Sequence, residues 1–264
     1  MIENGAVLKI LAIGDVVSAQ GCKYLRQELP KLKKELDADI VIVNGENSAV
    51  GNGITPQSAD YLLDCGADVV TLGNHGLRRR EIYDYLDDET KPVIRPANYH
   101  SSACGRGWCI VDKGYCRAAV INLQGIVYLE PIENPFSVID GVIDEIKNQG
   151  IETIFVDFHA EATSEKRAMG FYLDGRVSAL FGTHTHVQTS DNQILPNGTG
   201  YITDLGMTGT YYSVLGVEPR CIIEKLKTAL PVKFENNDGP CVLEGCLFEI
   251  DGNGKTVATR LIRR

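Results

Sequence analysis

The chain is poor in histidine and in positive charge, and it has no long apolar run. Its net charge of −9 argues against broad electrostatic binding to nucleic acids or anionic membranes, which requires a basic surface. No apolar segment approaches the length of about 20 residues that a membrane-spanning helix needs. The segment from Met1 to Lys9 lacks the pattern of a secretory signal. We therefore expect a cytoplasmic protein without a membrane partner and without a stable nucleic-acid partner.

The eight cysteines form no Cys-x-x-Cys pair. The closest spacings, Cys104 to Cys109 and Cys241 to Cys246, have four residues between the two thiols, which disfavours a zinc finger. A chain of 264 residues can also bury a sizeable core without disulfide bonds. Reduced and mostly buried thiols are therefore expected.

Short aliphatic runs alternate with helical patterns through the first two-thirds of the chain. The aliphatic runs predict strands at 6–13, 39–44, 67–73, 152–158, 177–182 and 200–206, and the region 92–129 adds several β segments. Helices are predicted at 24–36, 55–66, 79–88, 134–150 and 219–229. Pro30 is expected to kink or interrupt the first helix, and Thr55 is expected to cap the second.

Two further apolar runs, 241–250 and 255–262, flank Asp251-Gly252-Asn253-Gly254, which is typical of a hairpin. The order of elements predicts an α/β fold, an α+β sandwich of mixed β-sheets flanked by helices. No repeat or linker divides the chain, so one domain spanning 1–264 is expected. The hairpin either completes the sheet or forms a subunit contact in a homo-oligomer.

Polar side chains follow five of the aliphatic runs at the point where each run ends. The runs end at Asp15, at Glu46-Asn47, at Asn74-His75, at His159, and at His184 and His186. In open α/β sheets, ligands bind outside the carboxyl ends of the strands. Since neighbouring strands lie about 5 Å apart, residues that are remote in sequence can meet there. Four of the five histidines of the chain are in this group.

Each of these residues alone has a structural explanation as a turn, a cap, a loop tip or a hydrogen-bonded histidine. Five such strand ends together favour a site instead. Carboxylate, amide and imidazole ligands without thiolate suit iron, manganese or zinc. Seven candidate ligands exceed the needs of one tetrahedral ion and fit two ions about 3.5–4 Å apart. His184 and His186, two residues apart in an extended segment, would then each bind a different metal.

The motifs "GD", "GEN", "GNH", a lone histidine and "GTHTH", in this order, resemble those of the calcineurin-like metallophosphoesterases. The segments "NGENSAVGNGIT", "FHAEATSEK", "GTHTHVQTSD" and "ITDLGMTG" are similar to the YmdB-type branch of bacterial phosphodiesterases. The resemblance covers the chain from about Lys9 to Gly216, and it implies the calcineurin-like metallophosphoesterase fold.

The resemblance also implies roles for individual residues. The first metal would be held by Asp15, Glu46, Asn47 and His186, and the second by Glu46, Asn74, His159 and His184. His75 would be the general acid that faces the leaving oxygen. The family commonly uses two iron or manganese ions, and zinc is compatible with the same ligands.

The chain departs from the family pattern in three places. Val17 stands where the wider superfamily has a histidine, Ser18 and Cys22 replace residues of the loop after the first aspartate, and Gly76-Leu77-Arg78 replaces a Thr-Trp-Asp-like segment. The loss at Val17 is shared by the branch, and Asn47 would fill the gap. Glycines 51 and 53, Asn98, Glu161, Thr163, Ser164 and Lys166 are candidates for lining the cleft, each with a structural alternative.

The resulting hypothesis is a metal-dependent phosphodiesterase that acts on a small diester, including 2',3'- or 3',5'-cyclic nucleotides. A metal-bridging hydroxide would attack phosphorus in line, while His75 protonates the leaving oxygen. Two alternatives stay open. One is a phosphomonoesterase or nucleotidase with the same metal centre. The other is a regulatory protein that binds metal and nucleotide with little turnover.

Overall fold

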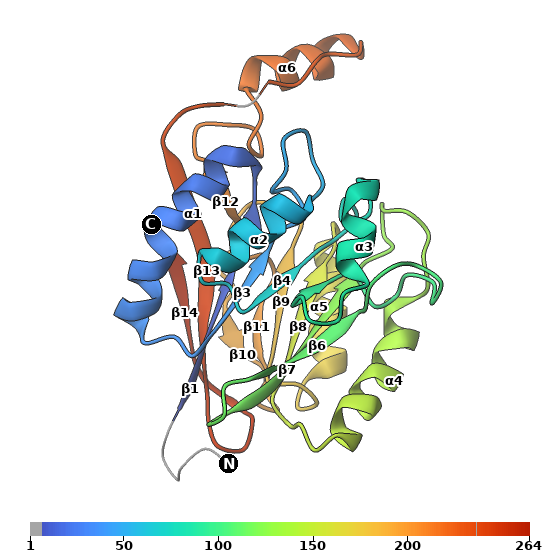
Figure 1. Cartoon of the computed structure of the whole chain (residues 1–264), viewed down its shortest axis with the longest axis vertical. Coiled ribbons are helices and arrows are strands. Elements are labelled where there is room, and N and C mark those ends of the chain that lie inside the picture. Colours follow the sequence, from blue (N-terminus) through green and yellow to red (C-terminus); the bar gives the residue numbers. More distant parts are fainter. Residues whose placement is uncertain (1–6, 236) are drawn as a thin grey trace.

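The computed structural model describes residues 7–235 and 237–264, and within them two mixed β-sheets pack face to face between helices (Figure 1). The first sheet has the strand order β2-β12-β13-β1-β3-β4-β5, with β14 paired to β13. Its strands are β1 (Leu8–Ile13), β2 (Asp15–Val16), β3 (Ile40–Asn44), β4 (Val69–Thr71), β5 (Val93–Ile94), β12 (Met207–Thr210), β13 (Cys241–Ile250) and β14 (Thr256–Arg263).

The second sheet has the order β10-β11-β9-β8-β7-β6. Its strands are β6 (Trp108–Asp112), β7 (Arg117–Gln124), β8 (Ile154–His159), β9 (Ala179–Thr183), β10 (Gln193–Ile194) and β11 (Gly200–Ile202). Strands β7, β8, β9 and β11 run parallel, as do β1, β3, β4 and β5 in the first sheet. In each sheet, the carboxyl ends of several parallel strands therefore lie together at one end of the sheet.

Helices cover the outer face of each sheet (Figure 1). They are α1 (Ser18–Leu36), α2 (Pro56–Asp64), the 3₁₀ turn η1 (Arg80–Ile82) with α3 (Tyr83–Leu86), α4 (Pro135–Asn148) and α5 (Thr163–Leu173). The remaining helix, α6 (Pro219–Thr228), lies above the sheets and covers neither face. Successive side chains of β1 point to opposite faces of the first sheet. Leu11 and Ile13 pack with α1 and α2 on one face, whereas Ile10 and Ala12 pack against the second sheet on the other. Helices α4 and α5 pack on the far side of the second sheet.

The prediction of an α/β sandwich with mixed sheets flanked by helices is confirmed. The C-terminal hairpin completes the first sheet, because β13 pairs with β12 through its first residues, with β1 through the rest of its length, and with β14. The capping prediction at α2 is also confirmed: Thr55 and Ser58 form a reciprocal capping box, with Pro56 at the first helical position.

Several predicted boundaries are wrong. Helix α1 begins at Ser18, six residues before the predicted start at 24, and continues through Pro30. Pro30 lies on the exposed face, so the carbonyl that loses its partner there is near water, while Leu25, Leu29 and Leu32 hold the opposite face in the core. The predicted helix at 79–88 is a 3₁₀ turn followed by the four-residue α3, and the predicted strand at 200–206 ends at Ile202.

All eight cysteines are free thiols in the described chain, and most of them are buried. Burial raises the pKa of Cys22 to about 12 and that of Cys109 to about 11, so these thiols stay protonated near neutral pH. Across the described residues, no helix combines the length and hydrophobicity needed to cross a bilayer.

Candidate metal centre

The eight polar residues predicted at the strand ends meet where the carboxyl ends of both sheets converge. Asp15 is the first residue of β2, which comes just after β1. Glu46 and Asn47 follow β3, and Asn74 and His75 follow β4. His159 is the last residue of β8, and His184 and His186 follow β9. Parallel pairing of β1 with β3, of β3 with β4 and of β8 with β9 brings these ends together.

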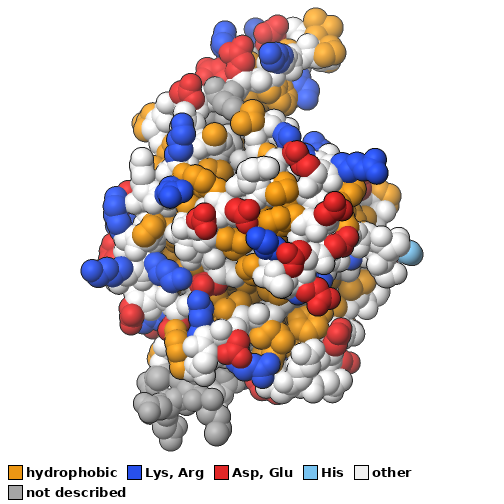
Figure 2. Space-filling view, viewed as in Figure 1, with side chains coloured by type: hydrophobic (Ala, Val, Ile, Leu, Met, Phe, Trp, Pro, Cys, Tyr) orange, Lys and Arg blue, Asp and Glu red, His pale blue; other side chains and the backbone are white. Residues whose placement is uncertain are grey.

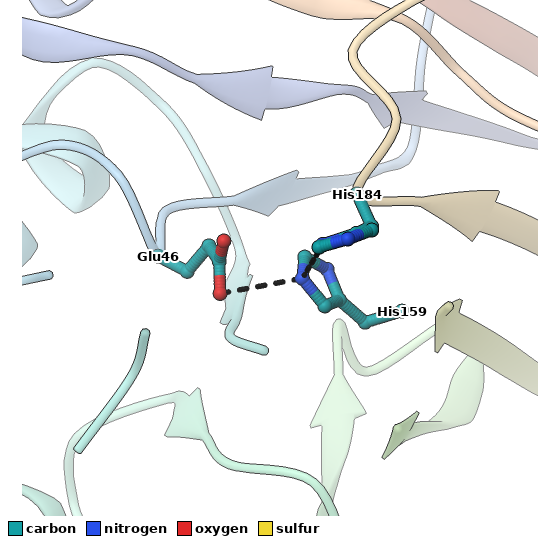
Figure 3. Close-up of side chains that lie close together, drawn as sticks. All are labelled: Glu46, His159 and His184. Carbon is teal, nitrogen blue, oxygen red and sulfur yellow. Dashed lines mark hydrogen bonds and ion pairs between the residues drawn. The ribbon is translucent and has the colours of Figure 1, made fainter. Parts of the chain in front are cut away.

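His159 lies at the centre of the tightest cluster. Its Nε2 atom is 3.0 Å from Asn74 Oδ1, 3.1 Å from His184 Nδ1 and 3.3 Å from Glu46 Oε2. Figure 3 shows Glu46 and His184 both facing the same ring nitrogen of His159. One ring nitrogen cannot form good hydrogen bonds to three partners at once. Two imidazole nitrogens, a carboxylate oxygen and an amide oxygen around one point instead form a donor set that suits a divalent metal.

A second, looser group contains Asp15 and His186. His186 Nε2 is 3.5 Å from Asp15 Oδ1 and 3.4 Å from Asn47 Nδ2. Asp15 Oδ1 and His186 Nδ1 are buried and have no hydrogen-bond partner among the described residues. An unpartnered buried carboxylate oxygen is costly unless an ion binds it. The donor set and this orphaned oxygen therefore fit a second metal beside the first.

Glu46 lies between the two groups. Its Oε2 atom faces His159 and accepts a hydrogen bond from the backbone N–H of His75 at 2.9 Å, while Oε1 accepts one from Asn47 Nδ2 at 2.8 Å. The side chain of Glu46 is only 1% exposed. One oxygen of Glu46 thus faces His159, and the other faces Asn47, which lies next to His186 in the second group; a carboxylate in this position can bridge two ions.

Asn47 connects the site to His75. Its Oδ1 atom is 2.8 Å from His75 Nδ1, and its nitrogen faces Glu46 and His186. Oxygen ligation by Asn47 requires the opposite assignment of the amide, with Oδ1 toward His186 and Nδ2 toward His75. His75 itself lies beside the cluster, with Nδ1 3.3 Å from Glu46 Oε1.

Burial and opposite charges set the protonation of the cluster. Burial opposes ionisation of Glu46, but His159 and His75 outweigh it and hold the pKa of Glu46 well below its usual range. Burial likewise disfavours the His159 cation, yet the Glu46 carboxylate raises the pKa of His159 to about 9. Burial and the neighbouring His159 charge lower the pKa of His184 to about 4. The acids are thus ionised and His184 is neutral near pH 7, as metal ligands must be.

Asp157 and Thr183 orient the His159 ring through its Nδ1 atom. Thr183 Oγ1 is 2.9 Å from His159 Nδ1 and donates to Asp157 Oδ1 at 2.7 Å. Thr183 therefore accepts a hydrogen bond from His159 Nδ1, which directs Nε2 toward the cluster, where a metal would displace the Nε2 proton. Burial raises the pKa of Asp157 to about 6. The sequence carried a signal for Asp157, because it stands two residues before His159 on the same face of β8.

The loop that carries His184 and His186 has an uncommon backbone. Both residues have positive φ angles, 99° and 61°, which cost energy for a residue with a Cβ atom. Asp204 holds this loop by accepting hydrogen bonds from Thr185 N at 3.1 Å and Thr185 Oγ1 at 2.7 Å. Lys166 donates to Asp204 at 2.7 Å and to the Thr183 carbonyl at 2.8 Å. Lys166 thus supports the loop instead of lining the cleft.

Asp204→Asn is expected to destabilise the protein by roughly 3–5 kcal/mol, because it leaves the buried Lys166 cation without its carboxylate. Chemical denaturation measures the loss. Asp140→Asn is the matched control: Asp140 pairs with Arg176 on the surface, where such a pair contributes at most about 1 kcal/mol. Equal losses in the two variants would contradict the supporting role of the buried pair.

A cavity of about 520 Å³ opens beside the cluster. Glu46, Asn47, His75, His184 and His186 line one side of it. Of the secondary candidates, Gly51 and Glu161 also line it, and Glu161 Oε2 is 2.9 Å from His184 Nε2. Asn98 has a structural role instead, since its Nδ2 atom donates to the carbonyls of Gln124 and Glu133.

Only some of the residues that depart from the family pattern line the cavity. Val17 and Ser18 line the cavity, and Ser18 begins α1 with a φ of 63°. Cys22 is buried, with its Sγ atom 3.5 Å from the Ser48 carbonyl. Among the described residues that line the cavity, His75 is the one contributed by the 74–78 loop. The unusual Gly76-Leu77-Arg78 segment is therefore not part of the cavity wall.

A family model described as YmdB-like protein matches residues 11–262. The 2',3'-cyclic-nucleotide 2'-phosphodiesterase of Bacillus subtilis (strain 168) is 46% identical over 248 residues, which cover 94% of this chain and 93% of that protein. The crystal structure of a phosphatase from Mycoplasma pneumoniae superposes with a TM-score of 0.90 at 32% identity, covering 98% of this chain and 94% of that one.

A 5'-nucleotidase precursor from Thermus thermophilus superposes with a TM-score of 0.57 at 12% identity, covering 98% of this chain and 54% of that one, which shows a shared fold alone. The metallophosphoesterase fold, predicted from the order of the motifs, is thereby confirmed, and it implies divalent metal ions. The match along nearly the whole chain shows that this protein belongs to the YmdB-like family and is an enzyme of the phosphoesterase class.

Proposed function

We propose that this protein is a dinuclear-metal-dependent phosphodiesterase that hydrolyses 2',3'-cyclic nucleotides. The observation that carries the proposal is the position of Glu46, with one carboxylate oxygen toward each of two groups of ligands beside a 520 Å³ cavity. The 46% identity to a 2',3'-cyclic-nucleotide 2'-phosphodiesterase supports this choice of substrate. A 3',5'-cyclic nucleotide is the second substrate to test.

Asn74, His159 and His184 with one oxygen of Glu46 would hold one ion. Asp15, His186 and the other oxygen of Glu46, with Asn47 in the reversed amide orientation, would hold the second. Iron or manganese suits these oxygen and imidazole ligands, and zinc is compatible with them. When bound, the two cations supply Lewis acidity that stabilises negative charge on the phosphoryl oxygens.

His75 supplies the proton in this proposal. Its ring lines the cavity, its side chain is 19% exposed, and its Nδ1 atom is 3.3 Å from Glu46 Oε1. With Nδ1 facing this carboxylate, Nε2 is the atom that can reach a substrate. A protonated His75 can pass its Nε2 proton to the leaving alkoxide, which is a poor leaving group without it.

Metal analysis of the purified protein, together with a panel of cyclic and linear diesters and monoesters, tests the proposal. We expect about two metal ions per chain and faster turnover of 2',3'-cyclic nucleotides than of 3',5'-cyclic nucleotides or nucleoside monophosphates. Preferential cleavage of monoesters would favour the nucleotidase alternative, whose fold this chain shares. Full metal content and tight nucleotide binding without turnover would favour the regulatory alternative.

Metal affinity is expected to fall as the pH is lowered. In the metal-free protein the pKa of His159 is about 9, because of Glu46, so this ligand carries a proton near neutral pH that the metal must displace. One displaced proton weakens apparent affinity by up to about tenfold per pH unit below that pKa. Calorimetric metal titrations in two buffers of different ionisation enthalpy measure the protons released. Affinity that is independent of pH from about 6 to 8 would contradict this protonation state.

A further inference from the structure

The cavity beside the metal ligands has a second wall of a different chemistry. It is formed by Val17, Leu215, Gly216, Val217, Val232 and Phe234. We propose that this apolar wall is the subsite for the nucleobase of the substrate, and that Phe234 is its stacking residue. This inference rests on the proposed function, because it assumes that the phosphate of a nucleotide binds at the metal ligands.

Five of the six wall residues, all except Val17, come from one excursion of the chain. Strands β12 and β13 pair directly at Thr210 and Cys241, and the described residues between them, 211–235 and 237–240, leave the first sheet and return to it. This segment carries α6, which rises above the body of the molecule at the top of Figure 1, at the same end as the carboxyl ends of the parallel strands. The excursion thus stands beside the metal ligands and can cover a substrate held there.

The segments before and after α6 are hydrogen-bonded to each other. The backbone N–H of Glu218 donates to the Glu235 carbonyl at 2.9 Å, and Asn237 Nδ2 donates to the Glu218 carboxylate at 2.7 Å. These bonds place Phe234, next to Glu235, on the same side of the cavity as the 215–217 turn. The Lys225 ammonium group is 4.9 Å from the centre of the Phe234 ring, which helps to orient the ring.

Val17 joins this wall to the metal centre. Gly216 packs so closely on Val17 that a Cβ atom at position 216 would lie 2.4 Å from Val17 Cγ1. Gly216 also has a φ of 94°, which favours glycine. Val17 stands where the wider superfamily has a histidine. It therefore contributes an apolar contact between the side of the cavity that carries the metal ligands and the apolar wall.

The exposure of the wall is what suggests a ligand. Leu215 is 45% exposed and Phe234 is 46% exposed, although both line the cavity. Apolar side chains that stay exposed inside a concave site are typical of binding surfaces. On the face shown in Figure 2, hydrophobic side chains are interspersed with charged side chains of both signs, whereas the six residues of the wall include no charged residue.

A nucleobase fits the chemistry of this wall better than a second charged group does. Every base presents a π-face that can stack on a phenylalanine ring and on methyl groups. The six wall residues offer no polar side-chain atom that could read the edge of a base. We therefore expect weak selectivity among bases, with purines bound better than pyrimidines because their stacking area is larger.

Phe234→Ala and Leu215→Ala test the inference with three substrates: adenosine 2',3'-cyclic phosphate, uridine 2',3'-cyclic phosphate and ribose 2',3'-cyclic phosphate without a base. For Phe234→Ala we expect KM for the adenosine substrate to rise about tenfold, within the range for loss of one stacking contact, with kcat nearly unchanged. KM for the baseless substrate should not change. Phe234→Tyr should restore the wild-type KM, because the ring is kept.

Phe171→Ala is the matched control, since Phe171 is an exposed phenylalanine on α5 that is not among the residues of the cavity wall. It should leave all three KM values unchanged. The inference is overturned if Phe234→Ala raises KM equally for the nucleotides and the baseless substrate, or changes none of them. It is also overturned if Phe234→Ala changes the oligomeric state and leaves KM unaltered, which would make the wall a subunit contact.

The proposed function fails in a different way. If the wild-type protein loaded with metal cleaves none of the three substrates, the phosphodiesterase proposal is wrong. If the wild-type protein cleaves all three with the same KM, the phosphodiesterase proposal stands and the nucleobase subsite is wrong.

Discussion

Glu46→Gln is expected to lose bound metal and phosphodiesterase activity together. The substitution keeps the size of the side chain but removes the negative charge that lies between the two groups of ligands. Loss of an outer residue that only orients a ligand typically costs 10–100-fold in metal affinity or activity, so loss of a shared ligand should exceed about 10²-fold in kcat/KM. Elemental analysis and kinetics on the same preparation measure both effects.

Glu165→Gln is the matched control for this variant. Glu165 is a buried glutamate of α5, and its Oε1 atom accepts a hydrogen bond from the backbone N–H of Ile126 at 2.9 Å. The other oxygen, Oε2, accepts a longer bond from the backbone N–H of Val127 at 3.4 Å. A glutamine keeps the shorter bond and loses only the longer one, so metal content and activity should be retained. A Glu46→Gln protein with full metal content and full activity would refute the bridging role of Glu46.

His75→Ala is expected to slow hydrolysis of a natural diester by about 10²–10⁴-fold, the usual contribution of a general acid. The same variant should lose little activity toward a nitrophenyl ester, because nitrophenolate leaves without a proton. Its metal content should stay at the wild-type level, since the proposal places His75 beside the ligands and not among them. Steady-state kinetics with both substrates, normalised to bound metal, gives the comparison.

His100→Ala is the control for the removal of a histidine, because His100 is exposed and contacts Ser102 away from the cavity. It should leave both substrates unaffected. If His75→Ala lost activity equally toward the natural diester and the nitrophenyl ester, His75 would not be the proton donor. A loss of metal in His75→Ala would instead make it a ligand or a support of Glu46.

The sequence predicted the eight polar residues at the strand ends because this pattern is local. Each of these residues follows a recognisable apolar strand, and in the structure all of them lie at the convergent carboxyl ends of the two sheets. The order of strands and helices likewise predicted the sandwich, since alternation of apolar runs is a property of neighbouring residues. Their roles as ligands and as proton donor are tested by the substitutions above.

The helix boundaries were predicted less well, for an identifiable reason. The start of α1 at Ser18 depends on Val17 and Gly21, whose backbone contacts Thr208 of a strand almost 200 residues away. Pro30 was expected to kink or interrupt this helix, but the helix continues through it, because the packing of Leu25, Leu29 and Leu32 against the first sheet outweighs the loss of one hydrogen bond on the exposed face.

The sequence by itself determined the class of fold, the family, and the set of side chains from which a metal centre can be built. The tertiary structure alone decided how these side chains are used. It placed one oxygen of Glu46 toward His159, put Thr183 and Asp157 behind the same histidine, and pinned the 183–186 loop with Lys166 and Asp204. It also brought Val17 and Phe234 to one cavity. These contacts join residues that are far apart in the chain, and only the packing of the two sheets sets their distances.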